Sequence, residues 1–101
     1  MDETEKARLA AAVRDALRTI ADPEIGRNIV DLGLIYDIAV EDDGSVRVTM
    51  TTTMRGCPAG DFLKAAAGNC AAAVPGVTSA EIRLTYDPPW SPQMMRETAD
   101  I

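Results

Sequence analysis

One cysteine, Cys57, stands where this sequence offers the best setting for chemistry. It lies between Gly56 and Pro58, after a predicted strand and at the start of a predicted helix. Cys57 would therefore occupy or adjoin the helix N-cap, where unpaired backbone N–H groups and the positive end of the helix dipole stabilise an anion. A thiol there has a lowered pKa, and the thiolate is the form that attacks electrophiles or binds metals. The alternative is a small residue that merely caps the helix.

The second cysteine, Cys70, shows the opposite pattern. It falls among alanines on the apolar face of the same predicted helix, where a cysteine behaves as a small hydrophobic residue. Its distance from Cys57 along the chain excludes a CxxC redox or zinc pair. We therefore expect Cys70 to be a structural residue.

Two further features supply candidate binding residues. Asp22 and Glu24 form a carboxylate pair around Pro23; such acidic loops are usually solvated, and Asp22 is equally suited to capping a helix start. Trp90 is the only tryptophan and follows two prolines that stiffen the chain before it. It either covers the core or is an exposed contact residue of the kind enriched at interfaces.

Hydrophobic periodicity predicts the elements that position these residues. Apolar residues recur every three or four positions in the helices and every second position in the strands. Asp-Asp-Gly-Ser at 42–45 supplies a hairpin turn, and prolines end the first helix and the last strand. The order predicts a two-layer α+β fold, α-β-β-α-β, with a three-stranded mixed sheet, helices on one face and a short C-terminal helix. The predicted elements are helix 3–20, strand 34–41, strand 45–54, helix 58–74, strand 80–86 and helix 91–98.

Length and composition exclude several classes of protein. The 101 residues predict a single domain over residues 1–101, and the 10 basic and 16 acidic side chains give a net charge of −6, which disfavours nucleic-acid binding. Histidine is absent, so one chain can build neither an imidazole metal site nor a His-based triad. The acidic N-terminal residues lack the features of a secretory signal, and no window is apolar enough to span a membrane. We expect a cytoplasmic protein.

Four motifs resemble one known family, the PaaD-like and SufT-like domain associated with iron–sulfur cluster assembly, long known only as a domain of unknown function. They occur in the family's order and cover essentially the whole chain. The motifs are Asp-Pro-Glu-Ile at 22–25, Asn-Ile-Val-Asp-Leu-Gly-Leu-Ile-Tyr-Asp at 28–37, Gly-Cys-Pro at 56–58 and Asp-Pro-Pro-Trp-Ser-Pro at 87–92.

The resemblance implies the α+β fold of cluster-assembly scaffolds and a role in maturing or delivering iron–sulfur clusters to apo-proteins. It carries the family's reactive cysteine onto Cys57 and its acidic loop onto Asp22 and Glu24, whereas Cys70 matches no motif. The chain lacks the cysteine-rich tail of the phenylacetate-oxygenase branch, so the general assembly branch fits better.

On this basis we expect an assembly or transfer factor, not a self-contained enzyme, with Cys57 as a transient ligand of an iron–sulfur cluster. Clusters typically take four ligands, so a homodimer that brings two Cys57 side chains together, an external thiol or a client protein must complete the shell. The expected partners are assembly proteins and apo-protein clients, with no nucleic acid and no membrane. Two alternatives stay open: an adaptor anchored by Trp90, and a thiol enzyme, which the absence of histidine disfavours.

The predicted topology brings the candidate residues together. Strands 34–41 and 45–54 form an antiparallel hairpin, so the loop before the first and Cys57 after the second belong to one end. Strand 80–86 follows a helical crossover and points to that same end, whether it pairs with the second strand or with the first. We therefore expect Asp22, Glu24, Cys57 with its neighbours Gly56 and Pro58, and Trp90 to share one surface.

Overall fold

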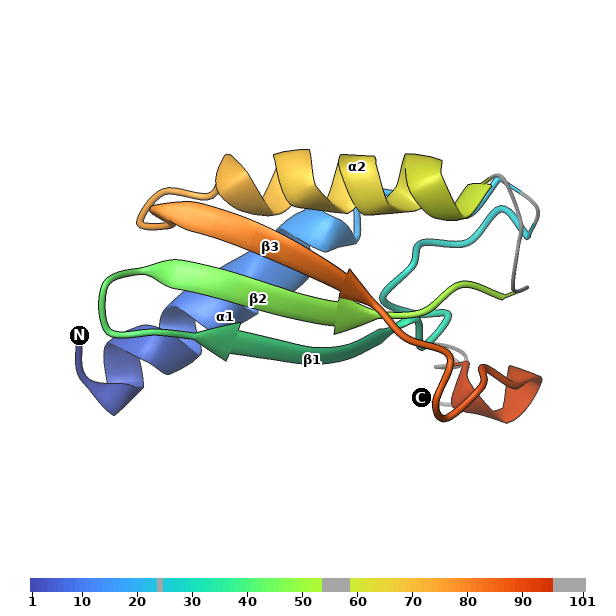
Figure 1. The fold of residues 1–101 in the computed structure, drawn as a ribbon, viewed down its shortest axis with the longest axis horizontal. Helices are drawn as coiled ribbons and strands as arrows, with labels where there is room; N and C mark the ends of the chain where they lie inside the picture. Colours follow the sequence, from blue (N-terminus) through green and yellow to red (C-terminus); the bar gives the residue numbers. More distant parts are fainter. Residues whose placement is uncertain (24, 54–58, 96–101) are drawn as a thin grey trace.

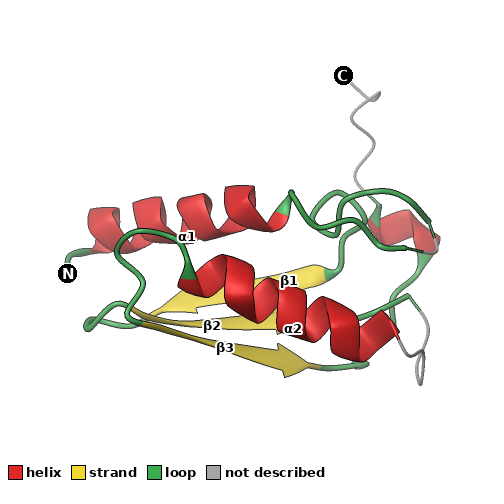
Figure 2. Ribbon diagram, turned by 90° about the horizontal axis from the view of Figure 1, so that it is seen from above, coloured by secondary structure: helices red, strands yellow, loops and turns green. Residues whose placement is uncertain are grey.

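A computed structural model describes residues 1–23, 25–53 and 59–95, and in it two helices cover one face of a three-stranded sheet (Figure 1; Figure 2). The two-layer α+β class and the order α-β-β-α-β agree with the expectation from sequence. The elements are α1 (Glu3–Leu17), β1 (Ile35–Val40), β2 (Ser45–Met50), α2 (Ala59–Ala72), β3 (Ser79–Leu84) and a single 3₁₀ turn, η1 (Pro92–Met94).

The sheet has β2 at its centre. β1 pairs with β2 antiparallel, with Ile38 opposite Val48, and β3 pairs with β2 parallel, with Ile82 opposite the same Val48. The third strand therefore pairs with the second, which settles the choice that the sequence left open. Because β2 and β3 run in the same direction, their C-terminal ends lie at the same end of the sheet (Figure 1).

The core lies between the sheet and the two helices. Alternation along β2 turns Val46, Val48 and Met50 toward the helices, and all three side chains are buried. The helices add apolar residues at spacings of three and four, the period of one helical face. Those from α1 are Leu9, Val13 and Leu17, and those from α2 and the turn after it are Leu63, Ala67, Ala71 and Val74.

Hydrogen bonds define both ends of α1. Asp2 caps it by accepting from the Glu5 backbone N–H at 2.8 Å, while the Glu5 side chain accepts from the Asp2 N–H at 3.1 Å, a capping box. The helix ends at Leu17, three residues earlier than the predicted residue 20. There the Thr19 hydroxyl and backbone N–H both donate to the Ala16 carbonyl, which closes the last turn.

β2 and the C-terminal helix are shorter than predicted. β2 ends at Met50, although the Thr51 N–H still donates to the carbonyl of Leu34, the residue before β1. Beyond Met50 the alternation of a strand stops, since the side chains of Thr51 and Thr52 are both buried. In place of a helix over residues 91–98 there is one 3₁₀ turn, and Ser91 makes no side-chain cap to it. The last three residues of that predicted helix lie outside the described residues.

Gly33 provides a test of how the C-terminal segment is held. Its φ of +80° favours glycine, and a Cβ there would collide with the backbone of Met94, whereas Gly26 has a φ of +82° and open space around it. We expect Gly26→Ala to lower the free energy of unfolding by about 1 kcal/mol through backbone strain alone. Gly33→Ala should cost more, because the segment at residues 90–95 must also move. Urea denaturation of both variants measures the difference, and equal losses would contradict this packing.

Candidate functional site

The end of the sheet to which β2 and β3 point is built around Thr52. Its hydroxyl lies 2.9 Å from the Tyr86 hydroxyl, which follows β3. On the other side, a Cβ added at Gly60 in the first turn of α2 would lie 3.6 Å from Thr52 Cγ2 and 3.9 Å from the Tyr86 oxygen. The end of β2, the end of β3 and the start of α2 therefore meet at one place.

Two buried threonines and two tyrosines at this end were not singled out by the sequence patterns. Thr51 and Thr52 are 0% and 4% exposed, so consecutive side chains are buried and the strand alternation has ended. Tyr36 of β1 donates from its hydroxyl to the Pro88 carbonyl at 2.7 Å. Burial raises the pKa of Tyr36, and a hydrogen bond with Thr51 opposes that rise. The run of three threonines after β2 was the available signal, since polar residues there break the expected apolar face.

Asp22 lies in the loop between α1 and β1 and is buried, with 1% of its surface exposed. Its carboxylate accepts from the Ile25 backbone N–H at 3.2 Å, and its own backbone bonds to Gly26 and Arg27 close the turn at 2.8 and 2.9 Å. The expectation of a surface carboxylate is wrong for this side chain. The side chain of a helix N-cap residue accepts a similar bond from the backbone N–H three residues later. Here, however, the residues after Asp22 form a turn and not a helix, so Asp22 does not cap a helix.

Trp90 is half-buried and packs against the core. Its indole N–H donates to the Leu32 carbonyl at 2.7 Å, so the polar end of the ring is satisfied within the chain. Of the two interpretations that the sequence allowed, the structure supports the core-covering one. The same bond joins the C-terminal segment to the loop that contains Asp22.

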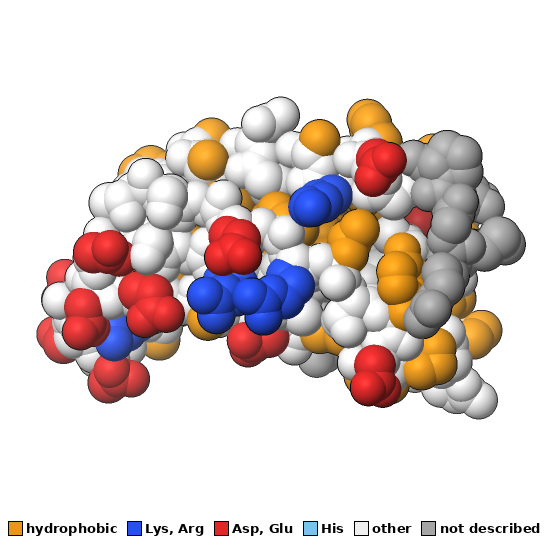
Figure 3. Space-filling model, viewed as in Figure 1, with side chains coloured by type: hydrophobic (Ala, Val, Ile, Leu, Met, Phe, Trp, Pro, Cys, Tyr) orange, Lys and Arg blue, Asp and Glu red, His pale blue; other side chains and the backbone are white. Residues whose placement is uncertain are grey.

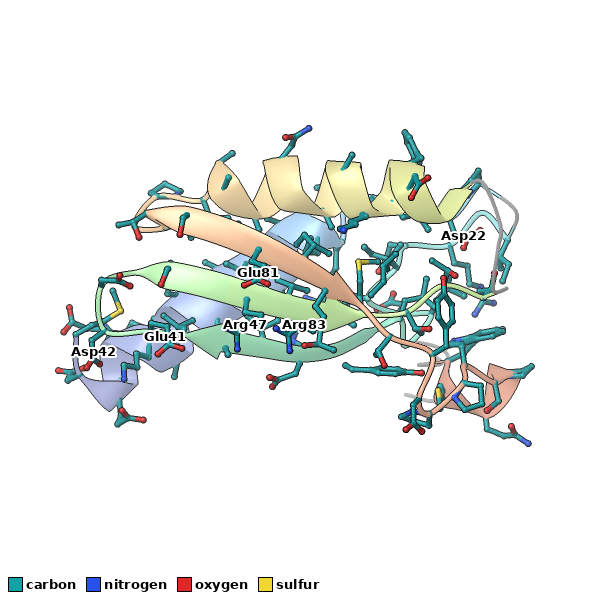
Figure 4. All side chains as sticks on the ribbon, in the orientation of Figure 1. Asp22, Glu41, Asp42, Arg47, Glu81 and Arg83 are labelled. Atoms are coloured by element: carbon teal, nitrogen blue, oxygen red, sulfur yellow. The ribbon has the colours of Figure 1, made fainter. Side chains whose placement is uncertain are left out.

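Asp22 and Trp90 are therefore brought to the same end of the domain, as the topology predicts. Figure 4 shows Asp22 at the end toward which β2 points, and Trp90 reaches that end through its bond to Leu32, two residues before the Leu34 that accepts from Thr51. Four residues of the expected surface lie outside the described part of the chain. They are Glu24, Gly56, Cys57 and Pro58.

Comparison with known proteins identifies the family. The sequence profile described as "Iron-sulfur cluster assembly protein" matches residues 10–82. This chain belongs to that family. A relative from Porphyromonas gingivalis, described as an Fe-S protein maturation auxiliary factor, is 48% identical over 82% of this chain and 79% of its own. The maturation auxiliary factor SufT of Staphylococcus aureus is 38% identical over 81% and 93%. The SufT-like character expected from the motifs is confirmed.

Solved structures share the fold of this chain. A domain of unknown function from Bacillus anthracis superposes with a TM-score of 0.91 at 29% identity, over 98% of this chain and 94% of that one. A conserved hypothetical protein from Thermotoga maritima superposes with a TM-score of 0.77 at 37% identity, over 88% and 87%. The chain thus has the fold of this family, and its role lies in iron–sulfur cluster assembly or transfer.

Cys70 lies on the face of α2 that packs against α1. Its thiol donates to the Ala16 carbonyl at 3.0 Å and lies 3.7 Å from the Thr19 hydroxyl. The side chain is half-buried and lines an apolar groove of about 400 Å³ between the two helices. This agrees with the structural role expected from its alanine-rich surroundings.

Two features are absent from the described residues. No group of three or more Cys, Asp or Glu side chains in this part of the chain is arranged to hold a metal ion. Neither α1 nor α2 is long and apolar enough to cross a membrane.

The buried carboxylate of Asp22 can be tested through stability. Asp22→Ala removes the acceptor for the Ile25 N–H, so we expect the free energy of unfolding to fall by about 1–3 kcal/mol. Asp22→Asn keeps a side-chain oxygen at that position and should lose less. Chemical denaturation of the two variants beside the wild type gives the ranking. An alanine variant as stable as the wild type would show that this carboxylate does not hold the loop.

Proposed function

We propose that this family member passes an iron–sulfur cluster to apo-protein clients and that Cys57 is a transient ligand of the cluster in transit. The membership of the family supports the cluster as cargo, since relatives are described as maturation auxiliary factors and, in Mycobacterium tuberculosis, as an iron–sulfur cluster carrier protein of which this chain matches 22%. The choice of Cys57 rests on the chain's own residues.

The single observation that carries this choice is the closeness of Thr52 and Gly60. These residues stand on either side of Cys57 in the sequence, and a Cβ at Gly60 would lie 3.6 Å from Thr52 Cγ2, at the end where β2 and β3 finish. The other thiol is already engaged, because Cys70 donates to a backbone carbonyl between the helices. Cys57 is thus the thiol of this chain left for a cluster, with Asp22 and Trp90 holding the neighbouring loops.

Cys57 supplies one ligand, and the other ligands of the cluster come from other molecules. The chain has 2 cysteines, and a cluster typically takes four ligands. Assembly proteins and apo-protein clients supply the others, and incomplete ligation by one chain favours transfer over storage. A free Cys70 fits a reducing compartment, and we place the protein in the cytoplasm. The role is accessory rather than enzymatic, and neither nucleic acid nor membrane is a partner.

Transfer would proceed by exchange of ligands on iron. A client thiolate binds an iron atom as the Cys57 thiolate leaves it, so one iron–sulfur bond forms and another breaks. The client thiol loses its proton to solvent and the released Cys57 thiolate can take one up. No electrons change hands in this exchange.

Anaerobic reconstitution with iron and sulfide tests the ligand role. We expect the wild type and Cys70→Ala to develop the visible absorption of a cluster and to mature an apo iron–sulfur client. Cys57→Ser should lose both while keeping its fold, because serine also caps a helix start well. Circular dichroism checks the fold of both variants.

Normal client maturation by Cys57→Ser would refute the ligand role. Tight client binding without colour in the wild type would favour an adaptor, and turnover of an electrophile would favour a thiol enzyme.

The two thiols should also differ in reactivity. Cys57 is expected to alkylate faster than Cys70 at neutral pH, because the Cys70 thiol is half-buried and donates to the Ala16 carbonyl. Peptide mapping after brief iodoacetamide treatment of the native protein measures both rates. Equal labelling would remove the case for an activated thiol at residue 57.

A further inference from the structure

The outer edge of β3 is open. β3 is the last strand in the order β1-β2-β3, and no other strand lies beyond it among the described residues. Its register with β2 is regular over the whole of Ser79–Leu84, so no bulge bends the edge away, and the strand contains no proline. Natural proteins usually block such an edge, because its unpaired N–H and C=O groups invite another strand.

Charges of opposite sign alternate on the outer face of this strand. Glu81 and Arg83 are both exposed and point away from the helices, on the face seen in Figure 3 and Figure 4. Within the chain, Glu81 accepts from Arg47 at 3.3 Å, whereas the Arg83 guanidinium lies 3.8 Å from the second Glu81 oxygen. The contact made by Arg83 is thus the longer one, and its charge faces solvent near the strand edge.

We propose that two copies of this chain associate through β3, antiparallel about a two-fold axis at Ile82. Residues directly opposite each other in antiparallel strands point to the same face of the sheet. The two-fold axis must therefore pass between a residue and the same residue of the second copy. A dyad at Glu81 or Arg83 would set like charges opposite each other, which is destabilising. A dyad at Ile82 instead sets each Glu81 opposite the Arg83 of the second copy. The strand is complementary to itself in this one central register.

The helix side of the same edge also leaves room for a second copy. A groove of about 490 Å³ runs between α2 and β3, with Ala80 and Ile82 on its strand side. Its helix side combines small residues with three polar side chains: Ala65, Gly68 and Ala72 with Asp61, Lys64 and Asn69. At Gly68 the helix approaches the strand so closely that a Cβ would lie 3.5 Å from Ile82 Cγ1. In the proposed pairing Ile82 meets its own copy, and Ala80 meets Leu84 of the other chain, so apolar side chains cover the strand side of the groove while its polar side chains can stay in water.

This arrangement separates the two functional ends. The strands of the pair run in opposite directions, so the end of β2 in one copy points away from the end of β2 in the other. Each copy therefore keeps an independent site, and the dimer forms without any cluster. The proposal does not rest on the function assigned to Cys57.

Charge reversal at the edge tests the register. We expect the wild type to sediment as a monomer–dimer equilibrium that salt weakens, since the pairs are exposed. Glu81→Arg presents two cations on each edge and Arg83→Glu presents two carboxylates, so each variant alone should raise the dimer dissociation constant by about tenfold or more. An equimolar mixture of the two variants restores both opposite-charge pairs and should dimerise again.

The control is Arg8→Glu, which makes the same change of charge at an exposed position on α1 and should leave the equilibrium unchanged. Circular dichroism checks each fold; if Arg47 beside the new arginine unfolds Glu81→Arg, the Arg83→Glu result alone decides. A monomeric wild type, a dimer insensitive to Arg83→Glu, or a mixture of folded variants that stays monomeric would overturn the proposal. Cys57→Ser should dimerise like the wild type, so failure here and failure of the cluster role are separate results.

Discussion

The parallel pairing of β3 with β2 is the constraint on which the rest of the domain depends. Parallel neighbours cannot be joined by a tight turn, so the chain must leave the end of β2, cross the sheet and return to the start of β3. α2 is that crossover, and it has to begin where β2 ends. Thr52 lies close to Gly60 at the start of α2 and its hydroxyl is 2.9 Å from that of Tyr86, so the end of β2, the start of α2 and the end of β3 lie side by side. A functional loop placed here has its two ends fixed to the core.

Sequence patterns predicted the elements well because alternation and helical spacing report which face of each element is buried. Val46, Val48 and Met50 alternate in sequence and are buried in the structure, so β2 was recognisable from residues alone. The direction of β3 followed from the length of the crossover, and with it the end at which Trp90 lies. Cys57 and the acidic loop were singled out from their residue types and positions, and the resemblance to the family then suggested what they do.

Burial of polar groups could not be predicted in the same way. A carboxylate in a loop is ordinarily exposed, and Asp22 is buried because backbone N–H groups of its own turn and the packing of the loop surround it. Thr51 and Thr52 are likewise both buried, although the alternation of a strand would turn one of the two side chains toward solvent. In both cases the burial depends on how other segments pack around the residue, which a local sequence pattern does not report. The residues whose burial was not predicted all lie at the candidate site, and functional sites are where local sequence preference and final structure most often disagree.

The distribution of charge bears on the thiolate proposed at Cys57. One group of acidic side chains lies around the hairpin turn and the start of α1, at the end of the domain opposite the one to which β2 points (Figure 3). There Lys6 lies 2.6 Å from Asp42, whose pKa is lowered by that hydrogen bond while the pKa of Lys6 is raised. Carboxylates near a thiol raise its pKa and favour the neutral form. At the other end Asp22 is buried and accepts from the Ile25 N–H of its own turn, whereas Asp61 in the first turn of α2 is exposed. The thiolate proposed for Cys57 therefore depends on the helix start to stabilise its charge against an acid four residues later in the sequence.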